Sequence, residues 1–144
     1  MKVYVIGSLR NPAVPDVAEL LREEGFEVFD DWFAAGPEAD DYWKAYEKAR
    51  GRSYVEALAG NAARHVFAFD KRHLDDADAV VLVLPAGRSG HLELGYAIGQ
   101  GKPGFVLLDS DSDRWDVMYQ FASAVCATPL DLVAALATQQ AVAA

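Results

Sequence analysis

Apolar residues follow two spacings along this chain: short unbroken runs and helical repeats. Val3–Ile6 is an unbroken apolar run and Ala79–Pro85 is a longer one, and both predict strands that are buried on two faces. Between them, the apolar spacing of Pro12–Glu24 predicts a helix, and Phe26–Asp30 predicts a second strand. A strand, a helix and a strand in such a short stretch form the βαβ unit of a parallel sheet.

The rest of the chain continues this alternation after one interruption. Residues 31–40 combine aromatic side chains with Gly36 and Pro37, so we predict a loop with exposed aromatic residues. Residues 40–69 predict two helices broken near Gly51, although "HVFAF" within Arg64–Phe69 could be a strand. The later spacing predicts a helix over Gly90–Gly101, a strand over Gly104–Leu108, and helices over Trp115–Val125 and Leu130–Val142.

This order of elements predicts an α/β fold. We expect a flavodoxin-like, doubly wound parallel sheet of four to five strands with helices on both faces, in a single domain spanning residues 1–144. Ligands of such sheets bind at the carboxyl ends of the strands. The first three predicted strands end in "GSLRN", "DDWFAAG" and "PAGRSGHLE", so we expect these segments to converge on one cleft.

Composition narrows the classes of function. The chain has 144 residues, of which 52% are hydrophobic and 24% charged, which is typical of one globular domain. Its net charge of −9 argues against a general nucleic-acid surface but allows a small anionic ligand held by a few Arg residues. Cys126 is the single cysteine, and the apolar run at the N-terminus is too short for a signal peptide or a membrane span. We therefore expect a cytoplasmic protein with no membrane partner.

Three known motifs fit the region after the main apolar strand only in part. "GQGKPG" satisfies G-x-G-x-x-G, but a helix precedes it and a strand follows it, which is the reverse of a dinucleotide site. "GRSGH" is similar to a nucleophile elbow but has His91 in place of the last Gly, with no Asp-then-His order after it. "HLE" copies the H-x-E of zinc deaminases, which also need P-C-x-x-C. A zinc site has no remaining ligand set, so we expect no metal.

After these three motifs are excluded, Glu93 is the candidate functional residue in this region. With Gly90 as N-cap, Glu93 would be the third helical residue, where a carboxylate meets free backbone amides and the helix dipole. That position accounts for Glu93 without any catalytic role. A carboxylate held there would also keep a low pKa, stay ionised and be able to attack an electrophilic sugar carbon.

In four segments the chain resembles the nucleoside 2-deoxyribosyltransferases and the related nucleotide N-glycosidases. "VYVIGS" is similar to the opening strand of the family, and "FDKRHLDDADAVVLVL" is similar to its Asp followed by its third strand. "SGHLELGYAIGQGKP" is similar to its Gly-x-x-Glu-apolar-Gly-Tyr-Ala helix, and this is the specific match. A two-helix insertion between the second and third strands also occurs in the family. The resemblance covers residues 3–108.

The resemblance implies an N-glycosyl enzyme without a cofactor. Glu93 would attack C1′ of a 2′-deoxyribonucleoside, release the base and form a covalent glycosyl-enzyme that a second base or water resolves through an oxocarbenium-like transition state. Asp70 would handle the base or its proton, and Tyr4 would orient Glu93 by a hydrogen bond. The alternatives are that Asp70 caps a helix or is simply exposed, and that Tyr4 is a core residue.

One departure from the family pattern concerns the 5′ end of the substrate. Transferases of free nucleosides have an Asp six residues before the nucleophile, where this chain has Gly87. "GSLRN" is similar to the first loop of relatives that hydrolyse 5′-nucleotides, in which Ser, Arg and backbone amides hold the phosphate. The candidate substrate-binding residues in these two loops are Gly7, Ser8, Arg10, Gly87, Arg88, Ser89 and Gly90. Arg10 and Arg88 could instead be ordinary surface charges.

Aromatic residues in polar surroundings are candidates for stacking on the base. These are Trp32, Phe33 and Trp43, with packing of the insertion as the alternative. His91 is expected to make a local hydrogen bond and to have no catalytic role. The resemblance also implies a homo-oligomer, a dimer or larger, in which a late segment reaches a neighbouring subunit's site. The candidates in that segment are Asp113, Asp116, Met118 and Tyr119.

The expected partner is therefore a small-molecule nucleoside or nucleotide and not a nucleic acid. Deoxyribosyl transfer is our leading hypothesis, and release of the free base from a 5′-monophosphate by water is close behind it. A module that binds nucleotides without turnover belongs to a different class and stays open. An NAD-cleaving enzyme with a catalytic Glu would break the same type of bond.

Overall fold

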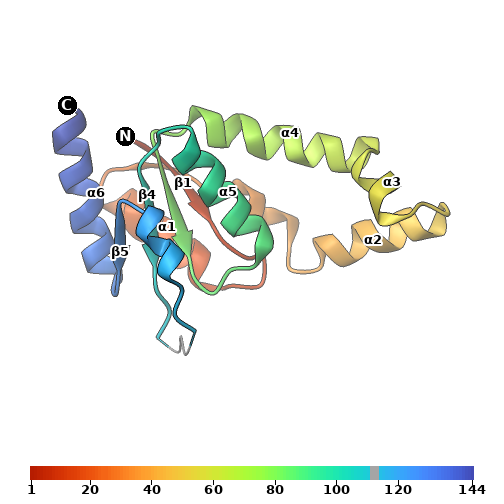
Figure 1. Cartoon of the computed structure of the whole chain (residues 1–144), viewed down its shortest axis with the longest axis horizontal. Helices are drawn as coiled ribbons and strands as arrows, with labels where there is room; N and C mark the ends of the chain where they lie inside the picture. Colours follow the sequence, from red (N-terminus) through yellow and green to blue (C-terminus); the bar gives the residue numbers. More distant parts are fainter. Residues whose placement is uncertain (111–113) are drawn as a thin grey trace.

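The computed structural model describes residues 1–110 and 114–144, and its centre is a parallel β-sheet. Within these residues, five strands pair in the order β2-β1-β3-β4-β5, all of them parallel (Figure 1). They are β1 (Lys2–Ile6), β2 (Glu27–Phe29), β3 (Ala79–Val83), β4 (Gly104–Leu107) and β5 (Ala124–Cys126). This is the strand order of flavodoxin-like folds, so the predicted fold class is confirmed.

Helices cover both faces of the sheet. The helices are α1 (Ala13–Glu23) and α6 (Pro129–Ala143) on one face, and α4 (Asn61–Asp76) and α5 (Arg88–Gly99) on the other. Along β3, Val81 and Val83 belong to the core beneath α1 and α6, whereas Val80 and Leu82 belong to the core beneath α4 and α5. Because successive strand residues point to opposite faces, this strand must be apolar at every position.

The order of the strands determines where a ligand could bind. β1 lies between β2 and β3, so the chain leaves β1 toward one neighbour and later returns to the other. The carboxyl ends of β1 and β3 are therefore the switch point of the sheet, where ligands of such folds bind. Tyr4 and Ile6 of β1 point toward α4 and α5, whereas Val3 and Val5 point toward α1 and α6.

Residues 39–60 form an arm that projects from the sheet, and the first half of α4 extends along it (Figure 1). The arm contains α2 (Ala39–Ala49) and α3 (Tyr54–Leu58). With α4 this gives three helices where we predicted two, and Gly51 has a φ of +71° at the predicted break. Ser53 and Glu56 form a capping box that starts α3. The buried Glu47 carboxylate accepts a hydrogen bond from Arg52 at 2.8 Å, which closes the turn from α2 to α3.

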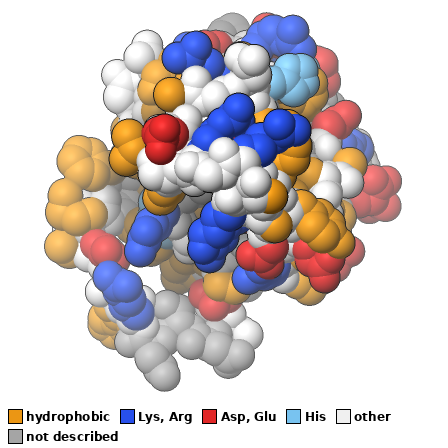
Figure 2. Space-filling view, turned by 90° about the vertical axis from the view of Figure 1, so that its right-hand side faces the viewer, with side chains coloured by type: hydrophobic (Ala, Val, Ile, Leu, Met, Phe, Trp, Pro, Cys, Tyr) orange, Lys and Arg blue, Asp and Glu red, His pale blue; other side chains and the backbone are white. Residues whose placement is uncertain are grey.

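The arm differs in charge from the rest of the molecule. Residues 39–60 have no net charge, in a chain whose net charge is −9. Their basic residues are Lys44, Lys48, Arg50 and Arg52, and their acidic residues are Asp40, Asp41, Glu47 and Glu56. Figure 2, which views the molecule from the side of the arm, shows several Lys and Arg side chains across the middle of this face. The acidic excess of the chain therefore lies outside the arm.

Two sequence-based predictions of secondary structure are wrong. Where we predicted a helix over Trp115–Val125, the chain forms the 3₁₀ helix η2 (Val117–Phe121) and then β5. The Asp116 side chain accepts a hydrogen bond from the Met118 amide at 2.9 Å and starts η2, and β5 satisfies its backbone by pairing with β4. The predicted loop 31–40 contains the 3₁₀ helix η1 (Asp31–Ala35) and the start of α2. The ambiguous segment Arg64–Phe69 lies in α4.

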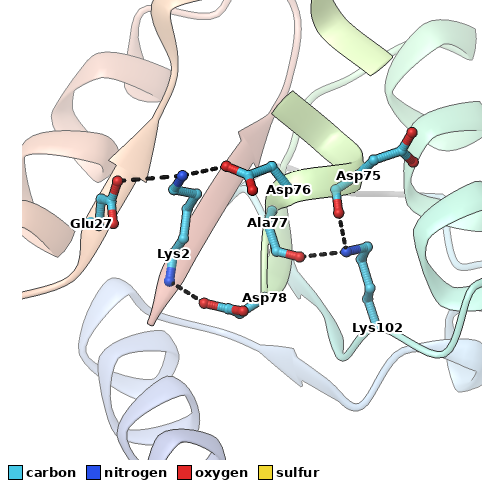
Figure 3. A network of polar contacts seen from close by, with 7 residues as sticks. All are labelled: Lys2, Glu27, Asp75, Asp76, Ala77, Asp78 and Lys102. Carbon is cyan, nitrogen blue, oxygen red and sulfur yellow. Dashed lines mark hydrogen bonds and ion pairs between the residues drawn. The ribbon is translucent and has the colours of Figure 1, made fainter. Parts of the chain in front are cut away.

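Ion pairs and hydrogen bonds tie the amino ends of the strands together, away from the switch point (Figure 3). The Lys2 ammonium pairs with Asp76 and lies 3.5 Å from Glu27, and the Lys2 backbone amide donates to Asp78 at 2.7 Å. The Lys102 ammonium donates to the carbonyl oxygens of Asp75, at 2.8 Å, and Ala77. Lys102 thus satisfies carbonyls at the end of α4, which is a structural role for the Lys of "GQGKPG".

Candidate active site

Three of the predicted catalytic side chains come together from three different elements. Tyr4 is in β1 and is 1% exposed, Asp70 is in α4, and Glu93 is in α5. The Tyr4 hydroxyl donates a hydrogen bond to the Glu93 carboxylate, and the negative charge of Asp70 acts on both residues. The parallel topology produces this meeting, because α4 and α5 cover the face of the sheet to which Tyr4 points.

The electrostatics of Glu93 differ from what the sequence predicted. Burial raises the pKa of Glu93 to about 7, the hydrogen bond from Tyr4 lowers it, and the charge of Asp70 raises it further. The prediction of a low pKa at helix position three is wrong, because Gly87 and not Gly90 is the N-cap of α5. Glu93 is therefore the sixth helical residue, in the second turn, beyond the free amides of the first turn.

Asp70 and Tyr4, the two neighbours of Glu93, also have raised pKa values, which favours their protonated, neutral forms. Burial raises the pKa of Asp70, and the charge of His73 partly offsets this effect. Burial raises the pKa of Tyr4, and the charges of Glu93 and Asp70 raise it further, so Tyr4 remains a neutral donor near pH 7. Two coupled carboxyl groups beside a fixed hydroxyl donor can hold one proton between them.

The glycines predicted to bind substrate divide into packing positions and one open position. A methyl group on Gly7 would lie 2.6 Å from Cγ2 of Val14, and one on Gly90 would lie 3.0 Å from Cδ1 of Leu82. Gly90 is buried and lets α5 approach the sheet, which is a packing role. Gly87 has no atom within 4 Å of such a methyl group, so it faces open space.

The first loop points partly toward the arm. The Ser8 hydroxyl accepts a hydrogen bond from the Arg10 amide at 3.1 Å, which fixes the turn after β1. The Arg10 guanidinium donates to the Pro37 carbonyl at 3.2 Å and pairs with Asp41 at 3.0 Å. Arg10 therefore joins the switch point to the arm, and its side chain is 66% exposed.

The second loop provides an uncapped helix start. Arg88 and Ser89 are exposed and form the first turn of α5, directly after Gly87. No side chain makes a capping hydrogen bond to this helix start within the described part of the chain. The first amides of a helix have no partner within the helix, so this end can accept an anion.

Asn11 is a buried polar residue that the sequence analysis missed. It is 5% exposed, and its amide nitrogen lies 3.5 Å from the Val83 carbonyl and 3.4 Å from the Pro85 carbonyl. Its side-chain oxygen accepts from the Ala13 amide at 3.0 Å. An Asn that bonds the amide two residues later forms an Asx turn, and its position just before a helix was the signal available in the sequence. Its second contact, with the end of β3, joins the two loops.

The predicted base-stacking residues do not form one group. The Trp32 indole N–H donates to the Val5 carbonyl at 2.8 Å, and its ring contacts Phe33 edge-on at 5.8 Å. Both rings are partly buried against the core, so the prediction of an exposed aromatic loop is wrong for them. Trp43 belongs to the arm, where its ring lies edge-on to Tyr54 at 6.3 Å.

His91 makes local hydrogen bonds, as predicted. Its Nδ1 lies 2.8 Å from the Gly87 carbonyl and its Nε2 lies 2.9 Å from the Tyr119 hydroxyl. The carbonyl can only accept, so Nδ1 bears the proton and Nε2 accepts from Tyr119 in the neutral ring. This contact ties η2 to the first turn of α5. Asp113, another candidate of the late segment, lies outside the described residues.

A hollow of about 490 Å³ lies beside this late segment. Its walls include Leu108 of the β4–β5 connection, Trp115, Tyr119 and Val125. Trp115 is 93% exposed and Met118 is 57% exposed. Such exposed apolar side chains are available for contact with another surface.

Two kinds of feature are absent from the described residues. In residues 1–110 and 114–144, no three His, Cys, Asp or Glu side chains are grouped so that they could hold a metal ion. In the same residues, no helix has both the length and the apolar character needed to cross a membrane.

Comparison with known proteins identifies the fold. The sequence matches no protein-family model and no curated protein. A 2-deoxyribosyltransferase from Bacillus psychrosaccharolyticus matches with a TM-score of 0.61 and 18% identity, over 92% of this chain and 90% of that one. The chain has the fold of that 2-deoxyribosyltransferase.

Two further solved structures share this fold. A conserved protein from Enterococcus faecalis V583 has a TM-score of 0.63 and 13% identity, over 96% of this chain and 98% of that one. The CMP N-glycosidase BcmB of Clostridium botulinum has a TM-score of 0.55 and 13% identity, over 94% of this chain and 98% of that one. The fold is thus shared by a transferase and a hydrolase, both named for nucleoside or nucleotide chemistry.

Proposed function

We propose that this protein is an N-glycosyl enzyme that cleaves 2′-deoxyribonucleosides or their 5′-monophosphates. The observation that supports this most strongly is the cluster of Tyr4, Asp70 and Glu93 on the switch-point strand and the helices that cover it. The shared fold of a 2-deoxyribosyltransferase and a CMP N-glycosidase supports the same reaction class.

The proposed reaction has two steps. In the first, a Glu93 carboxylate oxygen bonds to C1′ of the sugar while the C1′–N bond breaks and its electron pair leaves with the base. Asp70 gives a proton to the leaving base. In the second, an acceptor base or water attacks C1′, its proton passes to Asp70, and Glu93 leaves as a carboxylate.

The electrostatics of the cluster suit these roles. Because Tyr4 donates a hydrogen bond to Glu93, it orients the carboxylate and stabilises its charged form. Burial removes water from the carboxylate, which makes it a better nucleophile once it is ionised. Burial raises the pKa of Asp70, which is the direction that a general acid requires.

The 5′ end of the substrate would lie between the two loops at the switch point. The Ser8 hydroxyl, Arg10, and the uncapped first turn of α5 at Arg88 and Ser89 would hold a phosphate there. In the family resemblance, the Asp that serves free nucleosides stands where this chain has Gly87. This keeps hydrolysis of 5′-monophosphates as a close alternative to deoxyribosyl transfer.

We also propose that the protein works as a homo-oligomer, a dimer or larger. Large apolar side chains are exposed on the same helices that carry Asp70 and Glu93: Phe67 is 67% exposed and Leu92 is 74% exposed. Other apolar residues of α4 and α3 are also more than half exposed: Val66, Tyr54 and Val55. Such a surface is typical of a contact between protein chains.

One assay separates the possibilities. The enzyme is incubated with dCMP, dAMP, deoxycytidine, deoxyadenosine and NAD, each with and without an acceptor base, and free bases and new nucleosides are measured. Release of base only with an acceptor indicates transfer, and release without one indicates hydrolysis. The matched variant is Glu93→Gln, which should abolish cleavage. If the wild type binds a nucleotide tightly but releases no base, the result would contradict the proposed N-glycosyl activity and support a protein that binds nucleotides without turnover.

A further inference from the structure

Asn11 occupies a buried position between the two loops of the switch point. The Ala13 amide is a donor, so the Asn11 atom that faces it must be the side-chain oxygen. The opposite atom is then the NH₂ group, and it faces the carbonyls of Val83 and Pro85, which can only accept. The backbone of Asn11 also contacts the first loop, because its amide donates to the Ser8 carbonyl at 3.0 Å.

These contacts connect the segments that hold the candidate phosphate donors. Ser8 and Arg10 lie within three residues before Asn11, and the chain after Pro85 leads within four residues to Arg88 and Ser89. A 5′-phosphate has several oxygen atoms and would need donors from both loops at once, whereas a 5′-hydroxyl needs only one or two. The distance between the loops therefore matters more for a phosphate than for a hydroxyl.

We propose that Asn11 is a positioning residue that holds these loops at the separation a 5′-phosphate requires, and so sets a preference for 5′-monophosphates over free nucleosides. The proposal rests on the proposed N-glycosyl function. Asn11 itself is buried and acts through the two loops. Removing its NH₂ group leaves two carbonyls without their shared donor and frees the loops to move apart.

The test uses variants that keep an acceptor for the Ala13 amide and lose the donor to the Val83 and Pro85 carbonyls. Asn11→Asp and Asn11→Ser both retain an oxygen that can accept from the Ala13 amide, but neither can donate to both carbonyls. The matched control is Asn61→Asp, because Asn61 is the other asparagine of the chain and is exposed at the start of α4. We measure kcat and KM for dCMP and for deoxycytidine, together with the melting temperature.

The wild type should prefer dCMP, and both Asn11 variants should lower that preference about tenfold through KM for dCMP. Deoxycytidine kinetics and Asn61→Asp should change by less than about twofold. A wild type without preference for dCMP, an unchanged preference in the variants, or an equal loss on both substrates would overturn the proposal. Should Asn11→Asp fail to fold, Asn11→Ser decides.

Calorimetry of dCMP and deoxycytidine binding to the same proteins measures the preference between the two ligands without turnover. A wild type that binds dCMP more tightly but releases no base contradicts the proposed function, and the binding ratio in the variants then decides the role of Asn11. An active wild type with unchanged ratios in the variants contradicts the role of Asn11 alone.

Discussion

The carboxyl groups of Glu93 and Asp70 are close enough for the charge of one to raise the pKa of the other. In such a pair the protons belong to both groups, and the last proton leaves at a pH of about 7. The proposed reaction needs one proton in the pair, because Glu93 must be charged while Asp70 gives a proton to the base. Both the loss of this proton and the gain of a second proton should stop the reaction.

We therefore predict a bell-shaped dependence of kcat/KM on pH, with its descending limb near pH 7. Asp70→Asn removes the acid and should lower kcat by about 10²–10⁴-fold. The remaining activity should only rise with pH, and its midpoint should fall below about 7, because the charge that raises the pKa of Glu93 is gone. Asp40→Asn, an exposed arm position, is the control. A descending limb that survives in Asp70→Asn would contradict the shared proton.

A second prediction concerns how the charge of Glu93 changes the stability of the fold with pH. Its pKa is about 7 in the folded protein and 4.5 when unperturbed, so the folded state favours the protonated form. The stability gained by protonating Glu93 in the folded state is fully present below pH 4.5 and is lost as pH rises through about 7, where the buried carboxylate becomes charged. Glu93→Gln should thus stabilise the protein at pH 8, by up to about 3 kcal/mol more than at pH 4. Urea unfolding at both pH values measures this, and equal effects at both would refute the burial of the charge.

At single residues, the structure shows which predicted side chains lie near one another, and their catalytic roles stay predictions. Glu93, Asp70 and Tyr4 were selected from separate segments, and the structure brings them together. The position of Glu93 in its helix was wrong because Gly87 and Gly90 are both plausible caps, and only packing against Leu82 distinguishes them. The position of Asn11 just before a helix was visible in the sequence, but its contacts with Val83 and Pro85 were not, because these partners are backbone carbonyls, which no sequence pattern reveals.

At the scale of elements, α5 depends on a close approach to the sheet at Gly90. A side chain there meets Cδ1 of Leu82 at 3.0 Å and Cγ2 of Ile6 at 3.3 Å, whereas Gly95 of the same helix has open space around it. We predict that Gly90→Val destabilises the protein by about 1–3 kcal/mol more than Gly95→Val, because only the first forces the helix away from the sheet. Thermal unfolding of both variants measures the difference, and equal losses would show that α5 tolerates the side chain at Gly90.

The elements that the sequence predicted well are those with a strong apolar period. β3, β4 and all of β1 after Lys2 have no charged residue. Parallel strands that are buried on both faces must be apolar at nearly every position, so the sequence alone identifies them. β5 has three residues and a half-exposed Val125, so its pairing with β4 alone makes it a strand. The arm was predicted as helical with a break near Gly51, and the structure divides α2 from α3 there. The second break, at Gly60 between α3 and α4, was not predicted.

At the scale of the whole molecule, the exposed apolar side chains of α4 and the arm predict self-association. The wild type should elute as a dimer or larger species in size-exclusion chromatography with light scattering. Phe67→Glu, which places a charge on that surface, should shift the protein toward a single chain. Val142→Glu, at an exposed apolar position of α6, is the control and should leave the mass unchanged. A wild type that is monomeric at high concentration would contradict the proposed oligomer.

The central claim is that Glu93 forms a bond to the sugar. The most direct measurement mixes enzyme with deoxynucleotide or deoxynucleoside, quenches it rapidly in acid, and maps the digested protein by mass spectrometry. We predict a deoxyribosyl group on the peptide that contains Glu93, formed as fast as base is released and absent from Glu93→Gln. Rapid release of base with no sugar on Glu93 at any time, or undiminished cleavage by Glu93→Gln, would contradict the account.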